Sequence, residues 1–213
     1  KHVAEYFQIF NDRRVTQSFA MPLLLEVNEA KKYIGWLEDK YNQKKGIAWG
    51  ITLKNEKNII GVVGFNNLQP NHRGNVFGAL KHEFWNRGIM TESLSEVIKF
   101  GFNELKINRV DAETMQGNKA MQNVFLKLGF HPEGVLRDWL YWNNQYFDMT
   151  MFSLLRSEFP ASPKMGNLNS SDGSNLGIHQ KQSYKKLTNM HNQSQVIFLE
   201  HSDFSGWDSF VDE

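Results

Sequence analysis

The sequence contains no cysteine among its 213 residues. This absence excludes disulfides, thiolate nucleophiles and cysteine-bound metals, and with them any reaction that passes through a thioester on the protein. Net charge is also small, at +1, so neither nucleic acid nor a membrane surface is expected as the main partner. No apolar run approaches the length that spans a bilayer, and no signal peptide opens the chain. We therefore expect a cytoplasmic protein with no metal site.

The composition changes near Phe159. Before it, hydrophobic periodicity is nearly continuous, whereas residues 160–194 are dominated by Asn, Ser, Gln, Gly and Lys. Such a segment cannot bury enough apolar surface to offset the entropy lost on ordering. We predict a folded domain over residues 1–159, a polar linker over 160–194 and a short strand-like tail segment over 195–213.

Within the first 159 residues the hydrophobic pattern predicts an α/β fold, with a mixed, mostly antiparallel central sheet and flanking helices. Helices are expected over residues 4–10, from a cap at Asn28 to residue 41, from a cap at Thr91 to residue 105, and over 118–128. Strands are expected over residues 47–54, 59–68, 75–80, 109–115, 130–141 and 146–155.

The most informative segment runs from His82 to Phe130. A turn that contains Gly88 leads directly into a helix, so several backbone N–H groups converge beside the positive end of that helix. Such a turn can bind a pyrophosphate without a dedicated lysine. One turn alone is weak evidence, but here a helix, a strand, a second helix and Leu128-Gly129-Phe130 follow it in order. This series points to acetyl-coenzyme A.

Three stretches resemble the GCN5-related N-acetyltransferase (GNAT) superfamily, in its RimJ/RimL-like branch. Residues 83–92 are similar to the pyrophosphate loop of that branch. Residues 108–114 and 118–120 are similar to its next strand and fourth helix. The closing hairpin of the branch is similar to Leu128-Gly129-Phe130 with Glu133-Gly134, Asp148, Met149 and Ser153. The resemblance covers roughly residues 3 to 158, nearly all of the predicted domain.

The resemblance implies which residues bind the cosubstrate acetyl-CoA. The pyrophosphate would lie on the backbone amides of Asn86, Arg87, Gly88, Ile89, Met90 and Thr91. Met90 departs from the glycine or alanine usual at its position and suggests a tighter or shifted loop. The pantetheine arm would lie along Ala79, Leu80 and Lys81, and Asn118 and Asn123 would supply side-chain contacts. For Asn118 a helix cap is the compatible alternative, and for Asn123 a solvated helix face.

The resemblance assigns the catalytic groups less directly than it assigns the coenzyme-binding residues. The resemblance gives the Leu80 backbone amide as donor to the developing oxyanion. Phe125 and Met121 stand where relatives place a tyrosine or a serine as acid, and Leu140 stands where the branch has a carboxylate. Asp138 lies two residues before Leu140, so strand alternation predicts the same face and a role as general base, directly or through water. A solvated strand charge is the equal alternative.

The resemblance implies an enzyme that moves acetyl from acetyl-CoA to a primary amine by direct attack in a ternary complex. The acceptor could be a protein N-terminus or a small-molecule amine, and a homodimer is left open. Because the expected tyrosine and serine are absent, a catalytically weak domain that binds acyl-CoA as a sensor or scaffold is the alternative.

Both ends of the chain raise a question about the sheet. Relatives begin with an edge strand before the first helix, but here a helix-like segment follows Lys1 almost at once, so a missing upstream segment is expected. The strand over residues 47–54 would then be an unpaired edge, which proteins normally cover. We predict that Val196–Leu199 covers this edge, in its own subunit or in a partner. The alternative is that this segment begins another domain.

Overall fold

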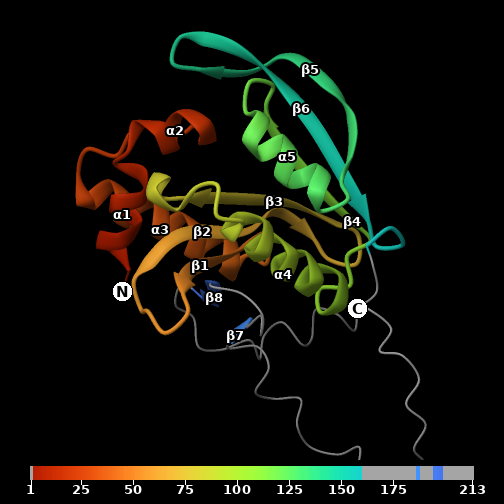
Figure 1. The fold of residues 1–213 in the computed structure, drawn as a ribbon, viewed down its shortest axis with the longest axis horizontal. Helices are drawn as coiled ribbons and strands as arrows, with labels where there is room; N and C mark the ends of the chain where they lie inside the picture. The colour runs from red at the N-terminus through yellow and green to blue at the C-terminus, as the bar shows by residue number, and fades with distance from the viewer. Residues whose placement is uncertain (1, 160–185, 188–193, 199–213) are drawn as a thin grey trace, which may run out of the picture.

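The computed structural model describes residues 2–159, 186–187 and 194–198 (Figure 1). The helices are α1 (Val3–Phe10), α2 (Arg13–Phe19), α3 (Val27–Asn42), η1 (His82–Phe84, a 3₁₀ turn), α4 (Ile89–Asn103) and α5 (Lys119–Lys127). The strands are β1 (Ile47–Leu53), β2 (Ile59–Gln69), β3 (Arg73–Leu80), β4 (Arg109–Met115), β5 (His131–Trp142), β6 (Gln145–Leu155), β7 (Lys186–Leu187) and β8 (Ser194–Phe198).

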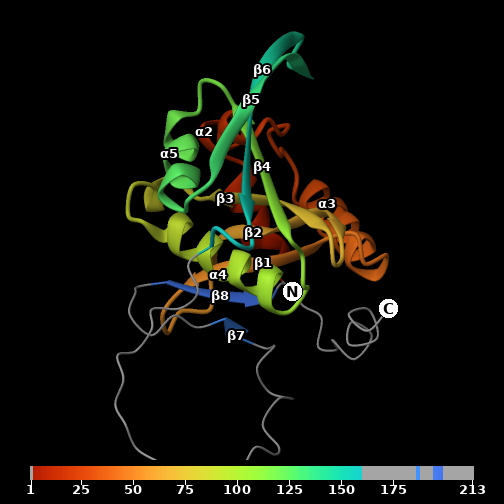
Figure 2. The ribbon, with the colours of Figure 1, turned by 90° about the vertical axis from the view of Figure 1, so that its right-hand side faces the viewer.

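The strands form one mixed sheet in the order β5-β6-β4-β3-β2-β1-β8-β7. All neighbours are antiparallel except β3 and β4, which are parallel. Helices α1, α2 and α3 lie on one face of the sheet, and α4 and α5 lie on the other (Figures 1 and 2). The sheet is therefore covered on both faces, and the expected α/β class is confirmed.

Each face of the sheet has its own hydrophobic core. Phe65, Leu94 and Phe125 belong to the core under α4 and α5, and they are almost completely buried. Phe10 and Leu24 belong to the core under α1, α2 and α3. Because side chains alternate along a strand, these cores show which face each strand residue occupies.

The central parallel pair separates after a short contact. Strands β3 and β4 pair only from Arg73 to Asn75 on β3 and from Arg109 to Asp111 on β4. Each strand continues beyond that point, β3 to Leu80 and β4 to Met115. The two strands therefore leave a gap in the middle of the sheet, and their main-chain groups along the gap do not pair with each other.

Most elements expected from periodicity are present within a few residues of their predicted bounds, but several details differ. Helix α2 was not predicted. Helix α3 is capped by Glu26 rather than Asn28, which lies inside its first turn. Helix α4 is capped by Gly88 rather than Thr91, which lies inside its first turn. Residues 186–187, assigned to the linker, form β7 and pair with β8.

The expected cover for the edge at β1 is confirmed. Strand β8 pairs antiparallel with β1, with Trp49 opposite Phe198 and Leu53 opposite Ser194. Leu199, which the prediction included, lies outside the described residues. The backbone groups of β1 therefore have partners on both sides, β2 and β8.

Candidate active site

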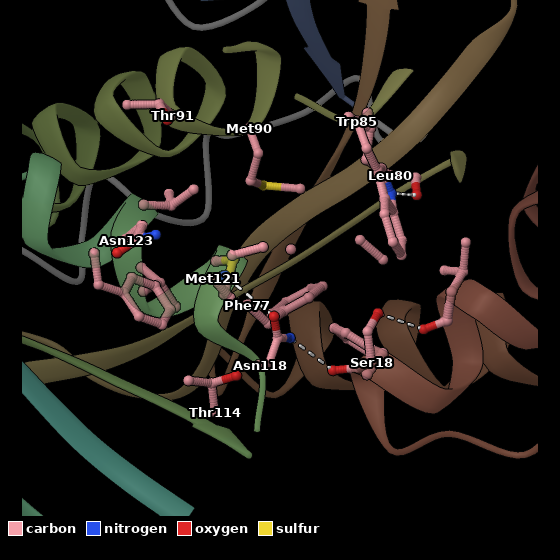
Figure 3. A pocket seen from close by; sticks show the side chains of 18 of the residues that line it. Ser18, Phe77, Leu80, Trp85, Met90, Thr91, Thr114, Asn118, Met121 and Asn123 are labelled. Carbon is pink, nitrogen blue, oxygen red and sulfur yellow. Dashed lines mark hydrogen bonds between the residues drawn. The ribbon is translucent and has the colours of Figure 1, made fainter. Parts of the chain in front are cut away.

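A pocket of about 580 Å³ opens at the gap between β3 and β4 (Figure 3). Its walls come from α2, β2, β3, the loop from η1 to α4, β4, α5 and the β5–β6 hairpin. The pocket thus reaches elements on both faces of the sheet. Nearly all the residues expected to bind the coenzyme line it: Ala79, Leu80, Asn86, Arg87, Gly88, Ile89, Met90, Thr91, Asn118 and Asn123.

The turn before α4 has the backbone of an anion site. Gly88 has φ of 78° and Asn86 has φ of 59°, both in the left-handed region that glycine and asparagine tolerate best. The first N–H groups of α4 have no partner within the helix, and Gly88 offers no side-chain cap. A Cβ on Gly88 would meet no atom within 4 Å, so the turn is open on the side where a phosphate would approach.

The backbone of β3 presents donors to the gap. The Lys81 N–H donates to the Ile60 carbonyl at 2.8 Å, so Lys81 points toward β2. Because backbone groups alternate along a strand, the amides of Gly78 and Leu80 point the other way, toward β4. The Leu80 carbonyl accepts a hydrogen bond from Trp85 Nε1 at 2.7 Å (Figure 3). The Leu80 amide is thus directed toward the gap, as the resemblance implies.

The structure places Lys81 outside the pocket. Its amide is engaged with β2, and its Nζ donates to Gln8 Oε1 at 2.9 Å. The alternation of backbone groups along β3 turns the Lys81 amide away from the gap. The role of Lys81 along the pantetheine arm stays a prediction.

Met90 extends into the pocket from the first turn of α4 and lies against β3 (Figure 3). A Cβ on Gly78 would stand 2.6 Å from Met90 Sδ, so the thioether occupies the space above that glycine. The larger side chain is accommodated because Gly78 has none. This packing explains how the loop tolerates a residue that departs from the usual small one.

Helix α5 contributes its N-terminus to the pocket. Asn118 accepts a hydrogen bond from the Met121 N–H at 3.1 Å and donates from Nδ2 to the Ser18 carbonyl at 3.2 Å (Figure 3). It therefore caps α5, the compatible alternative weighed for it, and also ties α5 to α2. Asn123 is an exposed side chain of the lining. Met121 and Phe125 present apolar groups where relatives have acids.

Asp138 does not line the pocket, although Leu140 does. The register of β5 against β6 shifts between Leu136 and Leu140, and Asp138 has φ of 50° within this bulge. Its N–H donates to Asp148 Oδ1 at 2.9 Å. Strand alternation does not hold across a bulge, so the argument that put Asp138 on the face of Leu140 was wrong. Its role as a base stays a prediction.

Sequence reasoning missed the side of the pocket that faces α2. Ser18 and Phe19 of α2 line it, and Phe19 makes an edge contact with Phe77 of β3, with ring centroids 6.4 Å apart. Asp12, whose side chain accepts from the Arg14 N–H, was the available signal for the start of this helix. Glu113 of β4 was missed as well, although it is the one carboxylate among the described residues of the lining.

Among the described residues, no three His, Cys, Asp or Glu side chains come together in a way that could hold a metal ion. In the same part of the chain, no helix is long and apolar enough to cross a membrane.

Comparison with known proteins identifies the family. The Acetyltransferase (GNAT) domain family model matches residues 1–131. The chain is 32% identical over 151 residues to the uncharacterized N-acetyltransferase YoaA of Bacillus subtilis (strain 168), which covers 70% of this chain and 85% of that protein. It is 27% identical over 123 residues to the ribosomal protein uS5-alanine N-acetyltransferase of Escherichia coli (strain K12), covering 57% of this chain and 63% of that protein.

A solved structure supports the fold. RimL, the ribosomal L7/L12 alpha-N-protein acetyltransferase in complex with coenzyme A, matches with a TM-score of 0.65 at 23% identity, covering 72% of this chain and 88% of that one. The chain therefore belongs to the GNAT family, in its RimJ/RimL-like branch, and is an acetyl-CoA-dependent N-acetyltransferase.

Proposed function

We propose that the protein transfers acetyl from acetyl-CoA to a primary amine by direct attack in a ternary complex. The observation that carries this proposal is the pocket itself, which connects the N-terminus of α4 with the opposite face of the sheet through the gap between β3 and β4. Two substrates can then meet at the gap from opposite faces.

The coenzyme side has groups that suit each part of acetyl-CoA. The pyrophosphate would lie on the amides from Asn86 to Thr91, where the helix dipole favours negative charge. The pantetheine arm would follow β3 beside Ala79, with Asn123 at its flank. The Leu80 amide would donate to the oxyanion that forms when the amine attacks the thioester.

The absence of cysteine supports direct attack. The chain has no cysteine, so no thioester forms on the protein. The acetyl group would pass from sulfur to nitrogen in one site. The acceptor is proposed as a protein N-terminus or a small-molecule amine, and the uS5-alanine N-acetyltransferase is an example of the first kind.

The proposal is tested by measuring the release of free coenzyme A from acetyl-CoA in the presence of each amine of a panel. The panel holds an alanine-initiated peptide, a serine-initiated peptide and spermidine, each with acetyl-CoA. Release that depends on one of the amines, with the acetylated product seen by mass spectrometry, supports transfer. Coenzyme binding without amine-dependent release from a broad panel would instead favour the sensor or scaffold alternative, which the apolar Met121 and Phe125 suggest.

A further inference from the structure

The end of β3 that borders the gap has main-chain groups that its neighbouring strand does not pair. The ladder between β3 and β4 ends at Asn75 and Asp111, whereas β3 continues to Leu80. The Lys81 N–H pairs with β2, and backbone groups alternate along a strand, so the N–H and C=O of Leu80 both face the gap. Leu80 is only 5% exposed. Main-chain groups that are shielded from water need hydrogen-bond partners, and the described residues of β4 pair with neither of these two.

The indole of Trp85 is the partner of one of these groups. Its Nε1 donates to the Leu80 carbonyl at 2.7 Å, and Figure 3 shows the Trp85 ring beside Leu80. An indole has one donor and no acceptor, so it can bind the carbonyl but not the amide. Trp85 therefore takes the place of β4 for the carbonyl and leaves the Leu80 N–H directed toward the pocket.

The residues around Trp85 fix its orientation. Its side chain is partly buried and packs against both hydrophobic cores. Its ring lies against the His82 ring, with the centroids 4.9 Å apart. Its N–H donates to the His82 carbonyl at 3.1 Å, where η1 ends. A side chain held at several points presents its Nε1 in one direction, so the hydrogen bond constrains the Leu80 peptide group.

Gly78 differs from Leu80 in what its main chain offers. It lies two residues earlier on β3, so its N–H and C=O also face the gap, beyond the end of the ladder with β4. An extended ligand could exchange two hydrogen bonds with Gly78. At Leu80 the carbonyl is engaged by Trp85, so the same ligand could only accept from the N–H. The free main chain of β3 thus ends in a single donor.

We propose that Trp85 is a positioning residue for acetyl transfer, because its hydrogen bond to the Leu80 carbonyl directs the Leu80 N–H at the thioester oxygen. This inference rests on the proposed N-acetyltransfer. With the Leu80 carbonyl engaged, an amide of the pantetheine arm pairs at Gly78 instead. The thioester oxygen, which only accepts, then lies at the Leu80 N–H. Trp85 sets the register of the acyl group on β3 and acts through Leu80 rather than on the reacting atoms.

Two changes at Trp85 remove the donor and keep an aromatic ring. Trp85→Phe loses the N–H together with part of the ring, whereas replacement of the Trp85 indole by benzothiophene keeps the shape and loses the N–H alone. The benzothiophene protein keeps the test decisive if Trp85→Phe does not fold. Trp36→Phe is the matched control, because Trp36 of α3 is 46% exposed and does not line the pocket.

The release of coenzyme A from acetyl-CoA is measured with an alanine-initiated peptide and with spermidine. Both Trp85 changes should lower kcat about tenfold, less than the roughly 10²–10³-fold that follows removal of an oxyanion donor itself. The KM for acetyl-CoA should stay within about twofold, because the phosphates and the arm keep their partners. Trp36→Phe should match the wild type. An unchanged kcat, or a loss confined to KM, would overturn the inference.

The thioester carbonyl reports the hydrogen bond directly. Infrared difference spectra between complexes with unlabelled acetyl-CoA and with acetyl-CoA carrying carbon-13 at the carbonyl isolate its stretching band without any amine. A hydrogen bond to this oxygen lowers the stretching frequency, so the wild-type band should lie below that of free acetyl-CoA. In both Trp85 variants the band should return toward the free value. A residue that only supports the fold would leave the band in place, and that result would overturn the inference even where kcat falls.

The spectrum also separates this inference from the proposed transfer. If neither amine releases coenzyme A from the wild type, the position of the band decides alone. A lowered wild-type band that returns toward the free value in the Trp85 variants would support the positioning role although transfer had failed. A wild-type band at the free value would overturn the inference, because the Leu80 N–H would then bind no thioester oxygen.

Discussion

Neighbouring side chains decide what each carboxylate on β4 can do. Asp111 and Glu113 are separated by one residue and share a face, yet only Asp111 has arginine partners. Burial, and then the negative charge of Asp111, raise the pKa of Glu113 above its ordinary value.

The raised pKa of Glu113 predicts a stability effect with a definite sign. A carboxyl whose folded pKa lies above its unfolded value favours the folded state when protonated, and that contribution is lost as pH rises through the folded pKa. Glu113→Gln should therefore melt at a slightly higher temperature than the wild type at pH 7 to 8. The difference should disappear toward pH 4, where both side chains are neutral.

Thermal unfolding of both proteins across this pH range measures the effect. A lower melting temperature for Glu113→Gln at pH 7 would show that the carboxylate stabilises the fold.

The second prediction at the residue scale concerns Gly88 and the affinity for acetyl-CoA. Gly88→Glu should weaken acetyl-CoA binding at least 100-fold, because the new side chain would enter the open side of the turn with a negative charge. Gly88→Ala adds only a Cβ at φ of 78° and should cost affinity mainly through strain of about 1 kcal/mol. Isothermal calorimetry measures both affinities.

Gly35→Glu provides the control for Gly88→Glu. Gly35 lies in α3, and a Cβ there meets no atom within 4 Å. It does not line the pocket, so the same substitution should leave coenzyme affinity intact. Unchanged affinity in Gly88→Glu would remove the loop from the coenzyme site.

At the scale of elements, Asn118 joins two helices that both line the pocket. Its Oδ1 caps α5 and its Nδ2 bonds the Ser18 carbonyl of α2. Asn118→Ala removes both bonds and should destabilise the protein by about 1 kcal/mol through the lost cap. Asn118→Asp keeps a cap acceptor with a charge that the helix dipole favours, and loses only the donor to α2.

Two measurements separate the two bonds of Asn118. Thermal unfolding should show a lower melting temperature for Asn118→Ala than for Asn118→Asp. Hydrogen exchange should be faster for the amides of α2 in both variants, because both lose the bond to Ser18. Protection of α2 equal to that of the wild type in both variants would mean that this bond does not hold the helix.

The elements also show which features a sequence can predict. The loop at Gly88 and the β4–α5 segment were predictable because their residues act through local backbone geometry. Helix α2 was missed because its seven residues give a weak periodic signal and its cap at Asp12 stands alone. Asp138 was misplaced because a bulge changes register without a composition that reveals it. Glu113 was missed because the sequence does not show that β4 brings this side chain to the pocket.

At the scale of the whole molecule, a distant segment completes the sheet. Strand β8 begins more than a hundred residues after β1 ends, yet its backbone pairs with β1 over five residue pairs. Without it, β1 would present a row of unpaired N–H and C=O groups beyond β2. The segment that seemed a tail therefore belongs to the same sheet as the site, although no residue of β8 lines the pocket.

This arrangement predicts that blocking β8 destabilises the domain and promotes association. Because successive N–H groups of a strand point to opposite sides, Val196→Pro together with Ile197→Pro removes one donor on each side of β8. The loss of the β1–β8 ladder should lower the free energy of unfolding by about 1 kcal/mol for each hydrogen bond lost. Val196→Thr with Ile197→Val keeps every backbone donor and the β-branched pattern, and is the control.

Thermal unfolding and light scattering compare the three proteins. The proline variant should melt earlier and self-associate through the exposed β1 edge, while its coenzyme affinity stays intact where it remains folded. A proline variant that melts with the wild type and stays monodisperse would show that β8 does not protect β1 in solution.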